Sequence, residues 1–312
     1  MKFDAVHYLK FNEDLKKKGT TTIGDVTVSG DTHELIYTYK LIGCYECPKN
    51  TSGYYGKAFV FKGFEGMRTF REGTGYTTEN CHDGHIIVFA HEGTQKFKDL
   101  IDDFYLAKKE LPPKAIMALG FVLFITQFFR DKVGCIEHTG HSLGATLAEI
   151  MTAASVDDWI VNRPSETFVD LVKYFRQGDS HDIPITALTF ETPGSRPIIS
   201  DKHGKEVLVE VDKRVHSFNS GENIVNTCME KVGRVHKMVG LDGGVLPNHF
   251  ISEISCYIKS GGSIEIDATK GYDDLARNSL IERAKIAIKA VTGRVFKKVK
   301  ETVASWLIFS RL

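Results

Sequence analysis

The sequence predicts an α/β protein whose mostly parallel central sheet has helices on both faces. Short strand-like apolar segments alternate along the chain with helical segments, and this alternation is typical of parallel sheets. Residues 85–90 are continuously apolar, as in a strand that is buried on both faces. The motifs described below directly follow predicted strands, and the functional groups of parallel sheets lie at those strand ends.

The elements are predicted in chain order from a short helix over residues 2–18, which is followed by glycine-punctuated strand-like segments within 21–43. The further predicted strands are 58–61, 85–90, 134–139, 183–191, 207–211 and 215–219. The further predicted helices are 96–108, 112–130 and 143–154. Pro112 and Pro113 suit a helix start because the N–H groups that they lack would have no helical partner there.

The composition excludes some classes of function. The 312 residues include 40 Lys and Arg and 40 Asp and Glu, so the formal net charge is zero, without the basic excess of nucleic-acid-binding proteins. Asp4 and Glu13 interrupt the N-terminal segment, so no signal peptide is expected. The longest apolar run, 115–129, is too short to span a membrane. We therefore expect a cytoplasmic or peripheral membrane protein that binds no nucleic acid, with export by another route left open.

The six cysteines are expected to be reduced thiols in loops and core, because nothing in the sequence indicates export. Cys44 and Cys47 form the one close pair, and in an alternative interpretation Cys81 and His82 complete a zinc site with them. No second paired motif supplies the usual ligand spacing. We therefore expect no metal and no organic cofactor.

The pentapeptide Gly140-His141-Ser142-Leu143-Gly144 fits the pattern G-x-S-x-G between a predicted strand and a predicted helix, which is the context of a nucleophile elbow. The sharp turn exposes the hydroxyl of Ser142, and the glycines Gly140 and Gly144 prevent collisions with the neighbouring strand and helix. A chance pentapeptide in a turn is the alternative. The flanking elements favour the functional interpretation, as do Ala145 and Ala148, which allow close helix packing.

Four blocks of the chain resemble, in the same order, the class 3 (fungal-type) lipase family of the α/β-hydrolase superfamily. The blocks are 88–95 with Asp99 and Asp103, 138–148, 187–195, and 219–225 with His236. The resemblance covers residues 54–258 and implies an α/β-hydrolase fold and the cleavage of acyl esters. The sequence departs from the family at Glu92, where the family has an arginine, and mildly at Ala145, where a glycine is common.

Acyl transfer by a serine needs a base that takes the hydroxyl proton and an acid that orients the base. The chain order in this fold is serine, acid, histidine, so the candidate bases follow Ser142. They are His181, His203, His216, His236 and His249. The segment 246–254 resembles the one that carries the family's catalytic histidine, which favours His249. His236 ranks second because it corresponds to a family histidine that is not the base.

The candidate acid comes from the segment that resembles the family's acid loop. Alignment on Asn219 places the acid at Glu222, whereas alignment on the following Ile-Val pair places it at Asn223, which carries no charge. Glu222 is therefore the candidate acid, with a loop carboxylate that has no catalytic role as the alternative. Asp212 and Asp242 are the other candidate acids.

The oxyanion hole is expected to combine the backbone N–H of Leu143 with the N–H and hydroxyl of Thr94. Thr94 follows the predicted central strand, which brings it to the edge of the sheet where the elbow lies. Two segments, 95–106 and 159–175, are candidates for a lid over the site. An ordinary covering helix is the alternative for both of them.

The C-terminal segment 280–312 has a helical apolar stripe and many basic residues. Such a basic amphipathic helix can lie on an anionic membrane surface, and a helix docked on the domain is the alternative. We therefore divide the chain into a lipase-like domain, 1–265, which includes the N-terminal helix, and a basic amphipathic tail, 266–312.

These residues predict a serine carboxylic-ester hydrolase that acts on lipid acyl esters, as a triacylglycerol lipase or a phospholipase-like enzyme, through a Ser-His-acid triad and an acyl-enzyme. The expected partner is a lipid or small-molecule ester substrate. An acyltransferase or thioesterase with the same triad is the alternative within catalysis. The departure at Glu92 and the open identity of the acid motivate a third alternative, a catalytically silent lipid-binding protein.

Overall fold

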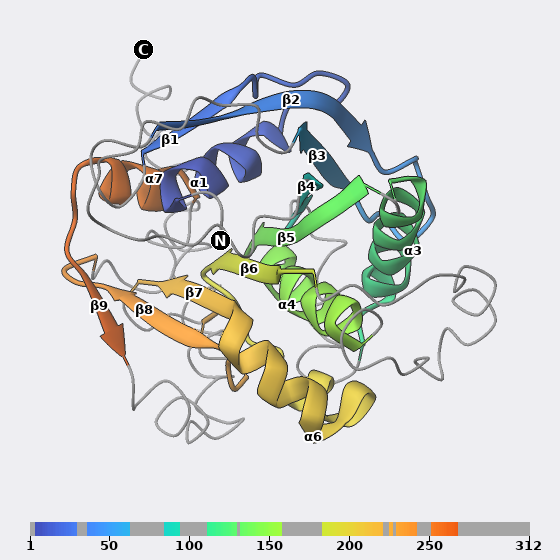
Figure 1. Cartoon of the computed structure of the whole chain (residues 1–312). Helices are drawn as coiled ribbons and strands as arrows, with labels where there is room; N and C mark the ends of the chain where they lie inside the picture. Colours follow the sequence, from blue (N-terminus) through green and yellow to red (C-terminus); the bar gives the residue numbers. More distant parts are fainter. Residues whose placement is uncertain are drawn as a thin grey trace, which may run out of the picture.

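The computed structural model of the chain contains a sheet whose strands follow their sequence order (Figure 1). The structure describes residues 4–29, 36–62, 84–93, 111–129, 132–157, 183–220, 225–226, 229–241 and 251–267. The helices are α1 (Ala5–Asp14), α3 (Pro113–Phe128), α4 (Leu143–Val156), α6 (Arg196–Arg214) and α7 (Ile251–Lys259). The strands are β1 (Val26–Ser29), β2 (Ile36–Glu46), β3 (Gly56–Lys62), β4 (His85–His91), β5 (Val133–His141), β6 (Ile185–Phe190), β7 (Val215–Asn219), β8 (Arg234–Met238) and β9 (Ile264–Asp267).

The centre of the sheet is parallel, as the alternation of strands and helices predicts. β4 to β8 pair in parallel with one another. The outer strands β1 to β3 join this centre through antiparallel pairs, as does β9 at the other edge. The strands that carry the predicted motifs all belong to the parallel part, so their C-terminal ends meet at one edge of the sheet.

Helices cover both faces of the sheet, and each face has its own apolar core (Figure 1). α3, α4 and α6 pack on one face, and α1 and α7 pack on the other. The continuous apolar run of β4 supplies both cores, because Ile87 and Phe89 point to the first face while Ile86 and Val88 point to the second. The prediction of a strand that is buried on both faces is therefore confirmed.

Among the described helices α4 is the most enclosed, since every residue from Leu143 to Val156 is buried. Alanine makes this possible, because a small side chain lets a helix approach the sheet closely. Ala145 and Ala148, both wholly buried, occupy the places at which the sequence predicted close packing. The helix is thereby fixed against β5 and β6, and its first residue follows Ser142 directly.

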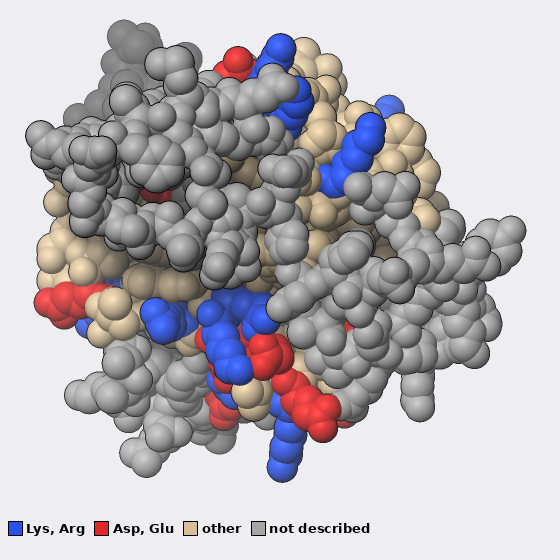
Figure 2. Space-filling view, viewed as in Figure 1, with Lys and Arg blue, Asp and Glu red and all other residues tan. Residues whose placement is uncertain are grey.

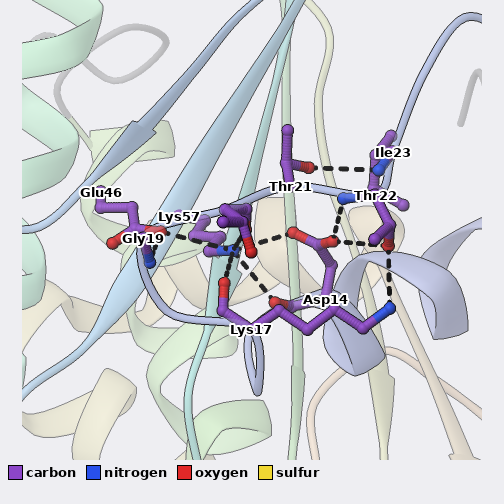
Figure 3. Close-up of polar contacts among 9 residues, drawn as sticks. Asp14, Lys17, Gly19, Thr21, Thr22, Ile23, Glu46 and Lys57 are labelled. Carbon is purple, nitrogen blue, oxygen red and sulfur yellow. Dashed lines mark hydrogen bonds and ion pairs between the residues drawn. The ribbon is translucent and has the colours of Figure 1, made fainter.

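A buried lysine fastens the N-terminal helix to the sheet (Figure 3). Lys57 of β3 donates from Nζ to a carboxylate oxygen of Asp14 at 2.9 Å and to the carbonyls of Asp14, Lys17 and Thr20 at 3.0, 2.9 and 2.7 Å. The carbonyls at a helix C-terminus have no helical partner, and this ammonium group binds the carbonyl of Asp14 at the end of α1 and two carbonyls of the turn that follows. α1 is in turn bonded to β5, because Tyr8 donates to Glu137 at 2.6 Å.

One predicted strand, 207–211, is wrong, because these residues belong to α6. Its alternating valines suggested a strand, but Val207 and Val211 are wholly buried whereas Val209 is 54% exposed. This burial has the spacing of one helix face. The opposite face is charged and forms ion pairs, including that of Arg196 with Asp212 at 2.6 Å. Figure 2 shows such blue and red side chains together at the lower centre, where Figure 1 places α6.

The other predictions of elements agree with the structure wherever it describes the chain. The N-terminal helix, the strands at 85–90, 134–139, 183–191 and 215–219, and the helices at 112–130 and 143–154 are confirmed, whereas β8 was not predicted. β9 runs across the predicted domain boundary at residue 265, so the sheet continues to Asp267. The predicted helix 96–108, both candidate lids and the tail segment 280–312 lie outside the described residues. Among the described residues, no helix has the length and apolar character that crossing a bilayer requires.

Candidate active site

Ser142 stands at the turn between β5 and α4 in a conformation that serine rarely adopts. Its φ is 60° and its ψ is −129°, and a residue with a side chain is strained at positive φ. A serine that precedes a helix usually caps it with its side chain, but Ser142 makes no such capping bond. A strained serine between a strand and a helix, without a side-chain cap, is the backbone geometry of a nucleophile elbow.

Glycines make this turn sterically feasible. A Cβ atom at Gly140 would lie closer than 3.0 Å to backbone atoms of Gly144 and Ala145. A Cβ atom at Gly144 would be equally close to the backbone of His91 and Glu92 at the end of β4. Both elbow glycines are therefore required by close backbone approach, as the sequence predicted, and the elbow is pressed against the end of the neighbouring strand.

The end of β4 lies directly beside Ser142. A Cβ atom at Gly93 would lie closer than 3.0 Å to the carbonyl oxygen of His141 and 3.4 Å from the Cβ of Ser142. The backbone after β4 therefore passes along the elbow, where a donor to an oxyanion has to be. Thr94, the predicted donor, is the next residue in the chain and lies outside the described residues.

Leu143, the other predicted donor, is the first residue of α4 and is wholly buried. The first N–H groups of a helix have no acceptor within the helix, and the helix dipole makes this end favourable for an anion. The backbone N of Ser142 donates to the carbonyl of Phe190 at 3.0 Å, which fixes the elbow to β6. The N–H of Leu143 thus belongs to the free N-terminal end of α4, next to Ser142.

A chain of buried polar side chains lies beneath the elbow. The hydroxyl of Tyr54 contacts Nδ1 of His91 at 2.9 Å, Nε2 of His91 contacts Nδ1 of His138 at 3.3 Å, and Nε2 of His138 contacts Ser155 at 3.3 Å. Burial lowers the pKa of His91 to about 3, and burial with the neighbouring His91 lowers the pKa of His138. Both rings are therefore neutral at pH 7, and the chain links β4, β5 and α4 without carrying charge.

The remaining predicted triad residues, His249 and Glu222, lie outside the described residues, as do Asn223, His181 and Asp242. His203 bonds to Asp157 at 2.9 Å, at the end of α4 that lies about 21 Å from Ser142 by helix length. That separation places His203 beyond reach of the Ser142 hydroxyl.

The other alternative residues have partners of their own. His216 and His236 contact each other, Nδ1 to Nε2, at 2.9 Å on the face that α1 and α7 cover. Asp212 accepts from Arg196 and, at 2.9 Å, from the backbone of Gly233. Asp212 therefore stabilises α6 against the segment that leads into β8.

Glu92, at the end of β4, has an ion-pair partner of its own. Glu92, where the resembling family has an arginine, has Oε1 3.7 Å from Nζ of Lys18, so an ion pair with the N-terminal segment supports this strand end.

Cys44 packs in the core of the α1 face, whereas Cys47 packs in the core of the α3 face. The two thiols of the alternative zinc site thus belong to opposite faces of the sheet. Within the described ranges, no three His, Cys, Asp or Glu side chains gather as a metal site.

The sequence analysis missed a carboxylate at the same sheet edge. Glu191 follows β6, is wholly buried and has a φ of 50°. It accepts hydrogen bonds from the backbone N–H of Ser220 and, at 3.1 Å, from the side-chain amide of Asn226. A charged residue directly after an apolar strand and before Pro-Gly was the signal that could have found it.

The ordered sheet, the helical layers on both faces and the serine elbow between β5 and α4 together form an α/β-hydrolase fold. No protein-family model matches the sequence, and no curated protein does.

Solved structures of fungal lipases resemble the chain at low identity. Rhizomucor miehei triacylglyceride lipase is 10% identical with a TM-score of 0.35, over 78% of this chain and 79% of that one. The lipase from Rhizopus microsporus var. chinensis is 13% identical with a TM-score of 0.33, over 66% and 63%. Lipase II from Rhizopus niveus is 11% identical with a TM-score of 0.35, over 78% of each chain. Likenesses of this degree assign no activity to the chain.

Proposed function

We propose that the chain is a serine carboxylic-ester hydrolase with Ser142 as its nucleophile. The strained elbow is the observation that carries the proposal. A glycine would adopt the φ of 60° at position 142 without strain, so the presence of serine indicates that the hydroxyl itself is used. The hydroxyl does not cap α4, and the elbow lies at the C-terminal edge of parallel strands, where chemistry is concentrated in such sheets.

The reaction follows from the roles that these groups can fill. Oγ of Ser142 attacks the ester carbonyl carbon while a histidine takes its proton, and the N–H of Leu143 stabilises the resulting oxyanion. The histidine then gives this proton to the leaving alcohol, and an acyl-enzyme remains on Ser142. Water, deprotonated by the same histidine, attacks the acyl group, and the carboxylic acid and free serine are released. No step of this sequence calls for a metal or an organic cofactor.

We assign the base to His249, the acid to Glu222 and the second oxyanion donor to Thr94. Support for Thr94 comes from its neighbour Gly93, which packs against the elbow. Support for Glu222 comes from its place in the segment after β7, whose two described ends, Ser220 and Asn226, are bonded to Glu191. His249 rests on the resemblance of its segment to the one with the family's histidine.

Lipid acyl esters are the proposed substrate class. The four blocks that resemble the class 3 lipases support this choice, and so does the basic amphipathic segment 280–312, which suits an anionic lipid surface. Hydrolysis of a panel of triacylglycerols, phospholipids and short soluble esters by the purified chain tests the proposal. Wild type is expected to release fatty acid, and both S142A and H249A are expected to lose this activity by orders of magnitude.

The panel also separates the alternatives. Transfer of the acyl group to an added alcohol in preference to water would indicate an acyltransferase, and preference for thioesters would indicate a thioesterase. Equal rates for wild type and S142A would refute the assignment of the nucleophile. Absence of turnover with retained lipid binding would identify a silent lipid-binding protein.

A further inference from the structure

We propose that Glu191 is a positioning residue of the acyl-transfer site, and that its carboxylate holds both ends of the segment that carries the acid. The inference rests on the proposed function and deepens it. Glu191 would act through the segment 220–226, in which Glu222 is the candidate acid, rather than on the substrate.

The sheet places Glu191 between the nucleophile and the acid segment. In the parallel register His141 pairs with Phe190, and Phe190 pairs with Phe218. The backbone N of Ser142 donates to Phe190 at 3.0 Å, and the backbone N of Glu191 donates to Phe218 at 2.8 Å. The end of β6 therefore stands between the elbow after β5 and the segment after β7, and the side chain of Glu191 reaches that segment.

The carboxylate accepts two hydrogen bonds, from residues that stand on either side of Glu222 in the sequence. One oxygen accepts from the backbone N–H of Ser220, and the other accepts from Nδ2 of Asn226 at 3.1 Å. Ser220 is 5% exposed, Asn226 is 2% exposed, and Glu191 is wholly buried. Hydrogen bonds to a carboxylate are shorter and stronger than neutral ones, and their donors are two and four residues from Glu222 in the sequence.

The backbone of Glu191 shows that this carboxylate is retained despite strain. Its φ of 50° lies in the left-handed region, where glycine is the default residue. Strained residues persist when the surroundings demand their side chain, and they gather at functional sites. A turn residue without such a task would gain from being glycine, so the two bonds of the carboxylate explain the choice of glutamate.

The substitution E191G distinguishes a positioning carboxylate from an ordinary turn residue, because it relieves the backbone strain and removes the carboxylate together. We expect kcat to fall about 10- to 100-fold with little change in KM. This fall in kcat corresponds to the loss of one charge-assisted hydrogen bond. E191Q retains an acceptor for the N–H of Ser220 and is expected to recover part of this loss. E265Q, the same chemical change at an exposed residue of β9, is the control with unchanged turnover.

A double mutant distinguishes positioning from a merely structural effect. If Glu191 acts through Glu222, E191G is expected to cost much less in an E222Q background, because groups that work as a unit are not additive. A lower fraction of folded enzyme would instead reduce both backgrounds by the same factor. Hydrogen exchange of the peptide 219–226 supplies an independent measurement, and E191G is expected to speed it about 10-fold while β5 stays protected.

The outcomes are distinguishable. An active wild type whose E191G variant keeps its turnover and its protection at 219–226 refutes this inference alone. Strictly additive losses in the E191G/E222Q double mutant also refute it. An inactive wild type refutes the proposed function and this inference with it. A fall in kcat that is confined to E191G and E222Q, with local loss of protection, supports both.

Discussion

The strain at the elbow predicts that removing the whole Ser142 side chain stabilises the protein more than removing the hydroxyl alone. S142A abolishes the nucleophile but keeps a Cβ atom at a φ of 60°, whereas S142G abolishes the nucleophile and the strain. A residue with a Cβ atom in a sparsely populated backbone region such as this one costs about 1–3 kcal/mol, and the extra freedom of glycine in the unfolded chain offsets about 0.4–1 kcal/mol of this. The free energy of unfolding of S142G should therefore exceed that of S142A by about 1 kcal/mol.

Urea denaturation of the two variants, each without activity, measures this difference directly, and thermal denaturation should show a gain of about 2–4 °C. A145G is the matched control. Ala145 lies inside α4 three residues further along the chain, so glycine there should lower stability by about 0.5–1 kcal/mol or more. An S142G variant that is no more stable than S142A would show that position 142 is not strained, and the elbow would lose its main physical support.

Three further predictions concern an elbow glycine, the buried histidines and the C-terminal segment. G144A should abolish turnover and lower stability, because its Cβ would collide with the backbone at the end of β4. G120A is the control, since its Cβ would have open space around it, and it should stabilise α3 by about 1 kcal/mol. A fully active G144A variant would contradict the packing of the elbow. Because the pKa of His91 is about 3 when folded and its ordinary value is 6.5, its contribution to stability is complete above pH 6.5 and is lost as the pH falls toward 3. The H138F variant removes the other buried imidazole, that of His138. It should reduce the slope of the free energy of unfolding against pH, between pH 6.5 and 5, by about 1.4 kcal/mol per pH unit. An unchanged slope in urea titrations would contradict the neutral state of His138. Deletion of residues 271–312 should abolish sedimentation with anionic liposomes and leave turnover of a soluble ester intact, and equal sedimentation would end the membrane proposal.

Much of the fold was predictable because hydrophobic patterning reports burial. The apolar run of β4 and the alanines of α4 each correspond to the packing that they predicted. β8 escaped prediction because only Val235 and Met238 of its five residues are buried, too few to give a pattern. The segment 207–211 was wrongly predicted as a strand because valine favours strands. Its packing against α4 stabilises it as part of a helix instead.

The candidate site was predictable where a motif fixes the backbone and hidden where charges meet in the core. Ser142, Gly140 and Gly144 are found at the turn that the pattern required. Lys57 and Glu191 are wholly buried charged residues, which hydropathy assigns to the surface. Several of their partners are main-chain groups, in segments far away along the chain, and the sequence carries no mark of such contacts.

The central claim is that Ser142 is an activated nucleophile, and covalent labelling with a fluorophosphonate tests it most directly. The probe phosphonylates a serine only where a base accepts its proton. Peptide mapping by mass spectrometry of the labelled wild type should find the adduct on Ser142, with none in S142A or in heat-unfolded protein. An unlabelled wild type, or an adduct on a different serine, would contradict the account.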